Sequence, residues 1–153
     1  MGMLQPTIVT WILIAFGALF IFLPMAYAEL LMALRPRSRQ AKDIIIGKGE
    51  EWRNETHFRM SHGAAWADLA IWLPLLVAGT LGVMLAQAWG YALWAASGAI
   101  SVYINIILWF SERDYVYPTK GPLMYYTVFW GFFVYWGLAV VVYAVLRLAG
   151  LVF

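Results

Sequence analysis

An aspartate stands at the start of a long apolar stretch, and this pairing restricts what the chain can fold into. Residues 69–86 carry no charge and are apolar apart from Thr80, and Asp68 immediately precedes them. A helix needs about 20 such residues to cross the roughly 30 Å hydrocarbon core of a bilayer. The stretch therefore predicts a membrane-spanning helix with an acid near one end. An acid inside a membrane usually faces protein and has a function, although at a helix start it can also reach interfacial water.

The composition extends this prediction to the whole chain. Hydrophobic residues make up 64% of the 153 residues and charged residues only 12%, which excludes an ordinary soluble globular domain. We predict an all-α fold, a four-helix transmembrane bundle that forms a single integral membrane domain over residues 1–153. The predicted helices span about residues 7–34, 61–85, 91–110 and 122–148.

The distribution of Lys and Arg predicts the orientation. The loops 35–60 and 111–121 carry nine of the ten Lys and Arg residues, and the link between the second and third helices carries none. By the positive-inside rule both loops are cytoplasmic and both termini are non-cytoplasmic, with Arg147 reaching water at the far interface. The short link predicts an antiparallel hairpin, and the apolar patch 43–47 suits the headgroup region. The plasma membrane is favoured, with the endoplasmic reticulum as the alternative.

Three polar residues from three predicted helices fall at a similar depth, namely Glu29, Asp68 and Asn105. If Glu29 and Asp68 face each other, charge repulsion and loss of hydration oppose ionisation of both, so we expect a shared proton. Such a pair is typical of general acid–base chemistry or of a cation receptor. The alternative is that each acid is satisfied separately, as a helix cap or in an ion pair with Arg59 or Arg113.

His62 precedes Asp68 on the same predicted helix, so the candidate catalytic residues are Glu29, Asp68 and His62. We expect no metal, because His57 and His62 are five residues apart whereas helical ligand pairs stand three or four apart. Many aromatic residues are expected to pack against lipid, and others to line a cavity and stabilise a cation through their ring faces. The candidate ligand-binding residues are Glu29, Asp68, Asn105, Trp72, Tyr103, Glu112, Tyr126 and Trp130.

The chain also lacks several kinds of feature. It has no cysteine, which excludes disulfides and cysteine metal sites. No internal repeat, phosphate-binding loop or metalloprotease motif stands out. We therefore expect no cofactor and no nucleic-acid partner.

The order of the acids resembles that of the EXPERA superfamily, which includes the sigma-two receptor and the emopamil-binding sterol isomerase. The similar elements are Glu29, the stretch 68–74 that reads Asp-Leu-Ala-Ile-Trp-Leu-Pro, and the aromatic run 108–112 that ends in an acid. The resemblance implies four helices around a pocket that opens within the membrane. It also implies an acid pair that receives an amine or protonates a sterol-like double bond, with Glu29, Asp68 and His62 as the candidates for proton transfer.

We predict a multi-pass membrane protein that binds a hydrophobic or amphipathic ligand, of the sterol, lipid or amine type, in an intramembrane pocket with paired acids. Three alternatives stay open: a small assembly or packing subunit of a larger membrane complex, a membrane isomerase of sterol or lipid double bonds, and a small transporter. Glycines that allow close contact with a second copy or another membrane partner favour the subunit. They are Gly79, Gly82, Gly98, Gly131 and Gly137.

Overall fold

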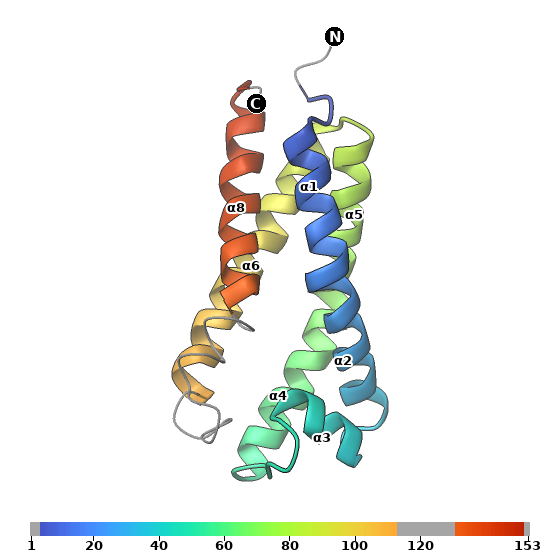
Figure 1. Cartoon of the computed structure of the whole chain (residues 1–153), viewed down its shortest axis with the longest axis vertical. Coiled ribbons are helices and arrows are strands. Elements are labelled where there is room, and N and C mark those ends of the chain that lie inside the picture. The colour runs from blue at the N-terminus through green and yellow to red at the C-terminus, as the bar shows by residue number, and fades with distance from the viewer. Residues whose placement is uncertain (1–3, 113–130, 152–153) are drawn as a thin grey trace.

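The computed structural model describes residues 4–112 and 131–151, and within these ranges the chain is helical and contains no strand (Figure 1). Four helices are long and apolar enough to cross a membrane. This confirms the prediction of an all-helical chain with four candidate membrane spans. The spans are Ile8–Leu34, Glu55–Met84, Ala88–Leu108 and Gly131–Leu148. Residues 113–130, which include most of the second predicted loop and the start of the fourth predicted helix, lie outside the described residues.

The first span is one continuous helix with a widened turn in its middle. It begins with a capping box, in which the Thr7 hydroxyl accepts from the N–H of Thr10 and the Thr10 hydroxyl accepts from the N–H of Thr7. These bonds satisfy amide groups that have no partner inside the helix. In chain order the span consists of α1 (Ile8–Phe16), the π-helical η1 (Gly17–Phe22) and α2 (Leu23–Leu34).

The second span begins at Glu55, six residues before the predicted start at residue 61. Asn54 caps this helix, because its side-chain oxygen accepts from the N–H of His57 at 2.8 Å. Glu55 in the first turn adds a favourable charge at the helix N-terminus. The span consists of α4 (Glu55–Ala67), the π-helical η2 (Asp68–Trp72) and α5 (Leu73–Met84).

The two π-helical segments belong to a short sequence repeat. No internal repeat was expected from the sequence. Residues 19–24 and 69–74 both read Leu-x-Ile-aromatic-Leu-Pro. In each copy the leucine before the proline donates its N–H to the carbonyl five residues back, that of Ala18 or Asp68. Proline has no N–H and its ring collides with the carbonyl four residues back in a regular helix, so a widened turn accommodates it.

The second and third spans form the predicted hairpin. α6 (Ala88–Glu112) follows α5 after a turn at residues 85–87, and the two helices pack side by side (Figure 1). A Cβ atom on Gly90 would lie only 2.2 Å from the carbonyl carbon of Gly82. The backbones of the hairpin are therefore in direct contact.

The fourth span, α8 (Gly131–Leu148), packs along α6 through a second glycine pair. A Cβ atom on Gly98 or on Gly137 would lie 2.7 Å from the carbonyl oxygen of the other residue. Gly79 likewise faces the backbone of Trp94. These glycines serve packing within the chain, so they no longer argue for contact with a partner helix.

Arg147 does not reach water at the far interface as predicted, because it is 1% exposed between the helices. Its Nη1 atom donates to the Tyr143 hydroxyl at 2.9 Å and its Nη2 atom donates to the carbonyl of Gln5 at 2.6 Å. The Tyr143 hydroxyl also bonds to the Thr10 hydroxyl at 2.5 Å. This cluster holds the start of the first span against α8.

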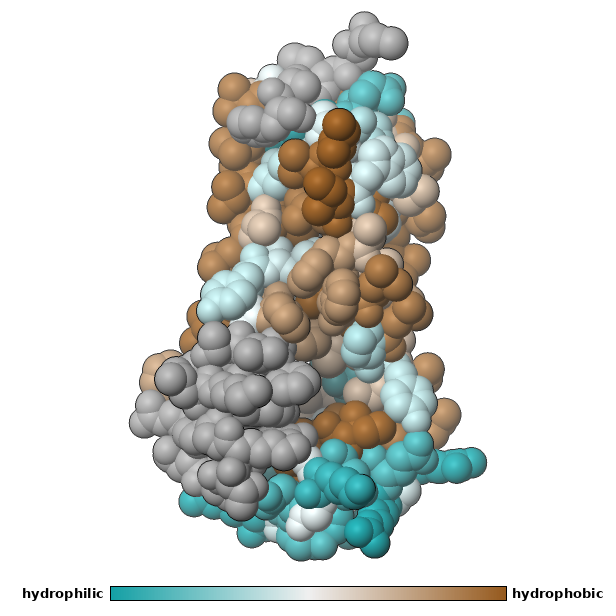
Figure 2. Space-filling view, viewed as in Figure 1, coloured by the Kyte–Doolittle hydropathy of each residue, from teal (hydrophilic) through white to brown (hydrophobic). Residues whose placement is uncertain are grey.

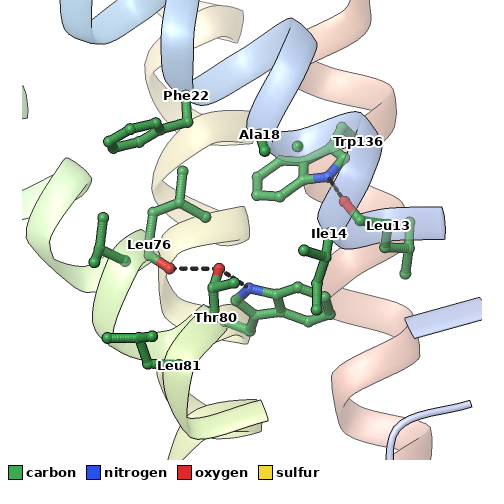
Figure 3. Close-up of a pocket in the computed structure, with 11 residues that line it drawn as sticks. Leu13, Ile14, Ala18, Phe22, Leu76, Thr80, Leu81 and Trp136 are labelled. Carbon is green, nitrogen blue, oxygen red and sulfur yellow. Dashed lines mark hydrogen bonds between the residues drawn. The ribbon is translucent and has the colours of Figure 1, made fainter. Parts of the chain in front are cut away.

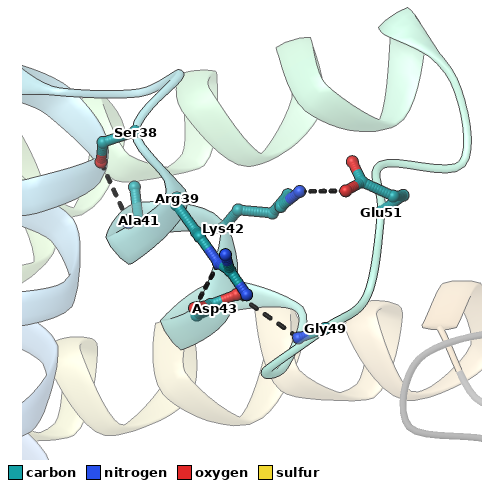
Figure 4. A network of polar contacts seen from close by, with 7 residues as sticks. All are labelled: Ser38, Arg39, Ala41, Lys42, Asp43, Gly49 and Glu51. Carbon is teal, nitrogen blue, oxygen red and sulfur yellow. Dashed lines mark hydrogen bonds and ion pairs between the residues drawn. The ribbon is translucent and has the colours of Figure 1, made fainter.

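At the opposite end of the bundle the first predicted loop contains a short helix, α3 (Arg39–Ile45), beside α4 (Figure 1). Charged residues cover this end, whereas apolar residues cover much of the visible length of the bundle (Figure 2). Lys42 pairs with Glu51 and Arg39 with Asp43, and Asp43 also accepts from the N–H of Gly49 (Figure 4). The predicted interfacial patch 43–47 thus forms the end of α3 and the residues just after it, and Ile46 in it is buried.

Candidate intramembrane acid site

A cavity of about 430 Å³ lies in the half of the bundle next to α3. All four spans contribute to its wall, with Glu29 from α2, Asp68 from η2 and Asn105 from α6. The structure therefore brings together the three polar residues for which a common depth was predicted. Ile44 and Ile45 of α3 line the same cavity. The aromatic part of the wall consists of Phe20, Trp72, Phe132 and Phe133.

The second span contributes a stripe of residues to this cavity. Ser61, Ala64, Asp68 and Trp72 follow one another at intervals of three and four residues. Residues at these intervals share one face of a helix. Asp68 and Trp72 therefore point into the same cavity. His62, six positions before Asp68, lies on another face of the helix.

Neither acid has a hydrogen bond or an ion pair with any residue in the ranges 4–112 and 131–151. Glu29 is only 6% exposed, and it lines the same cavity as Asp68. Arg59, one of the two predicted ion-pair partners, instead pairs with Glu55 at 3.2 Å. Arg113, the other predicted partner, lies outside the described residues.

Asn105 is 4% exposed and is held by one hydrogen bond. Its Nδ2 atom donates to the carbonyl of Ser101 at 2.8 Å, and its Oδ1 atom is buried without a partner among the described residues. The Ser101 hydroxyl in turn donates to the carbonyl of Phe133 at 3.0 Å, which ties α6 to α8 beside the cavity.

The remaining donors of the described lining are already engaged. The Ser61 hydroxyl donates to the carbonyl of His57 at 3.1 Å, and Nε1 of Trp72 donates to the carbonyl of Ser97 at 2.9 Å. The Ser61 hydroxyl and the Trp72 indole are therefore not available to a ligand, and the polar part of the described wall offers mainly acceptors, beside the second N–H of the Asn105 amide.

The structure does not bring His62 or Tyr103 to the cavity. His62 accepts a hydrogen bond from Nε1 of Trp66 at 3.2 Å and stacks on Phe58 with ring centroids 6.0 Å apart. Its position six residues before Asp68 places it on another face of the helix. Tyr103 is 68% exposed on the outer surface of α6.

The side chains of three further candidate residues lie outside the described part of the chain. Glu112 ends α6, but its side chain is outside the described part of the chain. Tyr126 and Trp130 fall within residues 113–130, which are also outside it. Among the described residues, no group of three or more His, Asp or Glu side chains is arranged to hold a metal ion.

The lining residues Phe20 and Phe133 were not predicted from the sequence. Phe20 lies within the first copy of the Leu-x-Ile-aromatic-Leu-Pro repeat, and the second copy contains Trp72, which was predicted. Trp72 aligns with Phe22, which lines the second cavity described below, whereas Phe20 occupies the variable position of the repeat. Comparison of the two copies would therefore not have identified Phe20. Nothing in the sequence distinguishes Phe133 from the other aromatic residues of the fourth span.

A second cavity, of about 150 Å³, lies farther from α3 and has a different character (Figure 3). Leu13, Ile14 and Leu76 are part of its apolar wall. Its two indole N–H groups are satisfied, because Trp136 donates to the carbonyl of Leu13 at 3.2 Å and Trp94 donates to the Thr80 hydroxyl at 3.0 Å. No charged residue lines this space in the described structure, so the acid chemistry is confined to the half next to α3.

Comparisons with protein-family models, with curated proteins and with solved structures found no match. The site is therefore interpreted from its own residues.

Proposed function

We propose that the protein binds an amphipathic, positively charged small molecule inside the membrane, with Glu29 and Asp68 receiving the charge. The observation that carries this proposal is that both acids line one cavity and neither has a partner among the described residues. An ionised acid at membrane depth costs about 2.5–3.5 kcal/mol on insertion scales. A bound cation would offset this cost, because it supplies the opposite charge that the described residues do not.

The rest of the cavity suits the apolar body of such a ligand. The rings of Phe20, Phe132 and Phe133 and the side chains of Ile44 and Ile45 supply apolar surface. Aromatic faces also attract a cation. A ligand with a charged head and an apolar body would therefore use both parts of the wall, in agreement with the amine or sterol-like ligand that the EXPERA resemblance implies.

The orientation is part of the same proposal. The basic end with α3 faces the cytoplasm, and both termini lie on the other side of the plasma membrane. The acid cavity then occupies the cytoplasmic half of the bundle. Binding is preferred to isomerisation because His62 lies outside the cavity, which leaves only Glu29 and Asp68 for proton transfer.

The test compares the wild type with Asp68→Asn and Glu29→Gln in nanodiscs. Binding of radiolabelled octylamine and thermal unfolding are measured on each, with Glu50→Gln as a control that removes an acid outside the cavity lining. We expect both cavity variants to fold and to lose binding, and the control to keep it. Unfolding of both cavity variants would instead make the acids structural, and unchanged binding would refute the acid site.

A further inference from the structure

We propose that the acid cavity selects a primary ammonium group over a quaternary one, because Asn105 adds a third hydrogen-bond acceptor to the two acids. This inference rests on the proposed function and specifies the class of cation. It depends on the orientation of one buried amide and on the absence of a described donor to its oxygen.

The orientation of the Asn105 amide is determined by its neighbour. Its Nδ2 atom lies 2.8 Å from the carbonyl oxygen of Ser101, which can only accept a hydrogen bond. Rotating the amide by 180° would place two oxygens against each other. The Oδ1 atom is therefore the end left without a partner, on a side chain that lines the cavity and is 96% buried, given its 4% exposure.

A buried carbonyl oxygen without a donor is destabilising, so this atom indicates a missing hydrogen-bond donor. The lining side chains among the described residues do not supply one, because Ser61 and Trp72 already donate to the backbone carbonyls of His57 and Ser97. A protonated acid could also donate to this oxygen, but with both acids ionised, as they are when they receive a cation, the donor that completes the site comes from the ligand.

A primary ammonium carries three N–H groups, and the cavity presents acceptors from three helices: Glu29 of α2, Asp68 of η2 and Asn105 of α6. A trimethylammonium group has the same charge and no N–H group. It satisfies the acids by charge alone and leaves the Asn105 oxygen without a donor. The two ligands therefore differ in hydrogen bonding while their attraction to the acids is similar.

The experiment measures binding of octylamine and octyltrimethylammonium to the protein in nanodiscs, with empty nanodiscs as the background. Octanol serves as an uncharged control of the same chain length. We expect octylamine to bind about tenfold more tightly than octyltrimethylammonium. The N-methyl and N,N-dimethyl derivatives should fall in between, in order of their remaining N–H groups.

The variant Asn105→Ala tests the role of the third acceptor. It should weaken the binding of octylamine several-fold and leave the binding of octyltrimethylammonium unchanged. The ratio of the two affinities should therefore fall. If this variant does not fold, the N-methyl series on the wild type still decides the question. Equal binding of all four amines overturns the inference and leaves the proposed function intact, whereas no binding of any amine above background overturns both.

Discussion

The contact between α5 and α6 leads to a prediction in which two similar substitutions have opposite effects. Gly90→Ala should destabilise the protein, because its Cβ atom would lie 2.2 Å from the carbonyl carbon of Gly82 and 2.3 Å from the amide nitrogen of Val83. Carbon atoms in ordinary contact are about 3.5–4.0 Å apart, so the helices would have to separate by more than about 1 Å. Gly63→Ala places its Cβ atom where nothing lies within 4 Å.

The magnitudes follow from two opposing effects. Alanine in place of glycine stabilises a helix by about 0.8–1.0 kcal/mol, and this is the whole effect expected at Gly63, which lies inside α4. At Gly90 the same gain is outweighed by overpacking, which typically costs about 1–3 kcal/mol and more against rigid backbone. Because the contact at Gly90 is with backbone, the upper cost of about 3 kcal/mol applies, and the expected net loss of stability is about 2 kcal/mol.

Thermal unfolding of both variants and the wild type in one detergent measures these effects. For a chain of this size 1 kcal/mol corresponds to about 2–4 °C, so Gly90→Ala should melt several degrees lower and Gly63→Ala a few degrees higher. If Gly90→Ala melts at or above the wild-type temperature, the two backbones are not in contact and the structure of the hairpin is refuted.

Two further predictions concern the far end and the orientation. Arg147→Met should lower the free energy of unfolding by about 1–3 kcal/mol, measured by thermal unfolding, because it removes the bonds to Tyr143 and Gln5; an unchanged melting temperature would contradict the role of the cluster. Because the chain has no cysteine, single variants Lys48→Cys and Gln87→Cys can be labelled with a membrane-impermeant maleimide. Lys48→Cys should react only from the cytoplasmic side and Gln87→Cys only from the other, and labelling of both from one side would contradict the orientation.

The sequence was sufficient to predict the four spans and the meeting of three polar side chains. Hydropathy determines the spans, because a helix in lipid needs a long apolar run and satisfies its own backbone. Counting residues from the polar ends places Glu29, Asp68 and Asn105 at similar depths, and three helices in one bundle leave few other places for them.

Other features depend on packing that the sequence does not reveal. The burial of Arg147 requires two neutral acceptors: the Tyr143 hydroxyl one turn earlier in α8 and the carbonyl of Gln5. Gln5 lies far away along the chain, so it reaches Arg147 only in the folded bundle. The early start of the second span depends on the cap by Asn54, a local signal that the charged composition of the loop obscured. His62 was included for its chemistry, although its spacing from Asp68 does not place both on one helix face.

The two acids lie at similar distances from the prolines of the repeated Leu-Pro segments. Glu29 lies five residues after Pro24, and Asp68 lies six residues before Pro74. At about 1.5 Å per residue both acids are therefore about 8–9 Å from their proline along the helix. Because the two spans run in opposite directions (Figure 1), both displacements lead towards the α3 end. Asp68 also opens the second widened turn, since its carbonyl accepts from the N–H of Leu73. Glu29 lies in the regular helix beyond the first widened turn, so the two acids share a side and a distance from their prolines and not a position in the repeat.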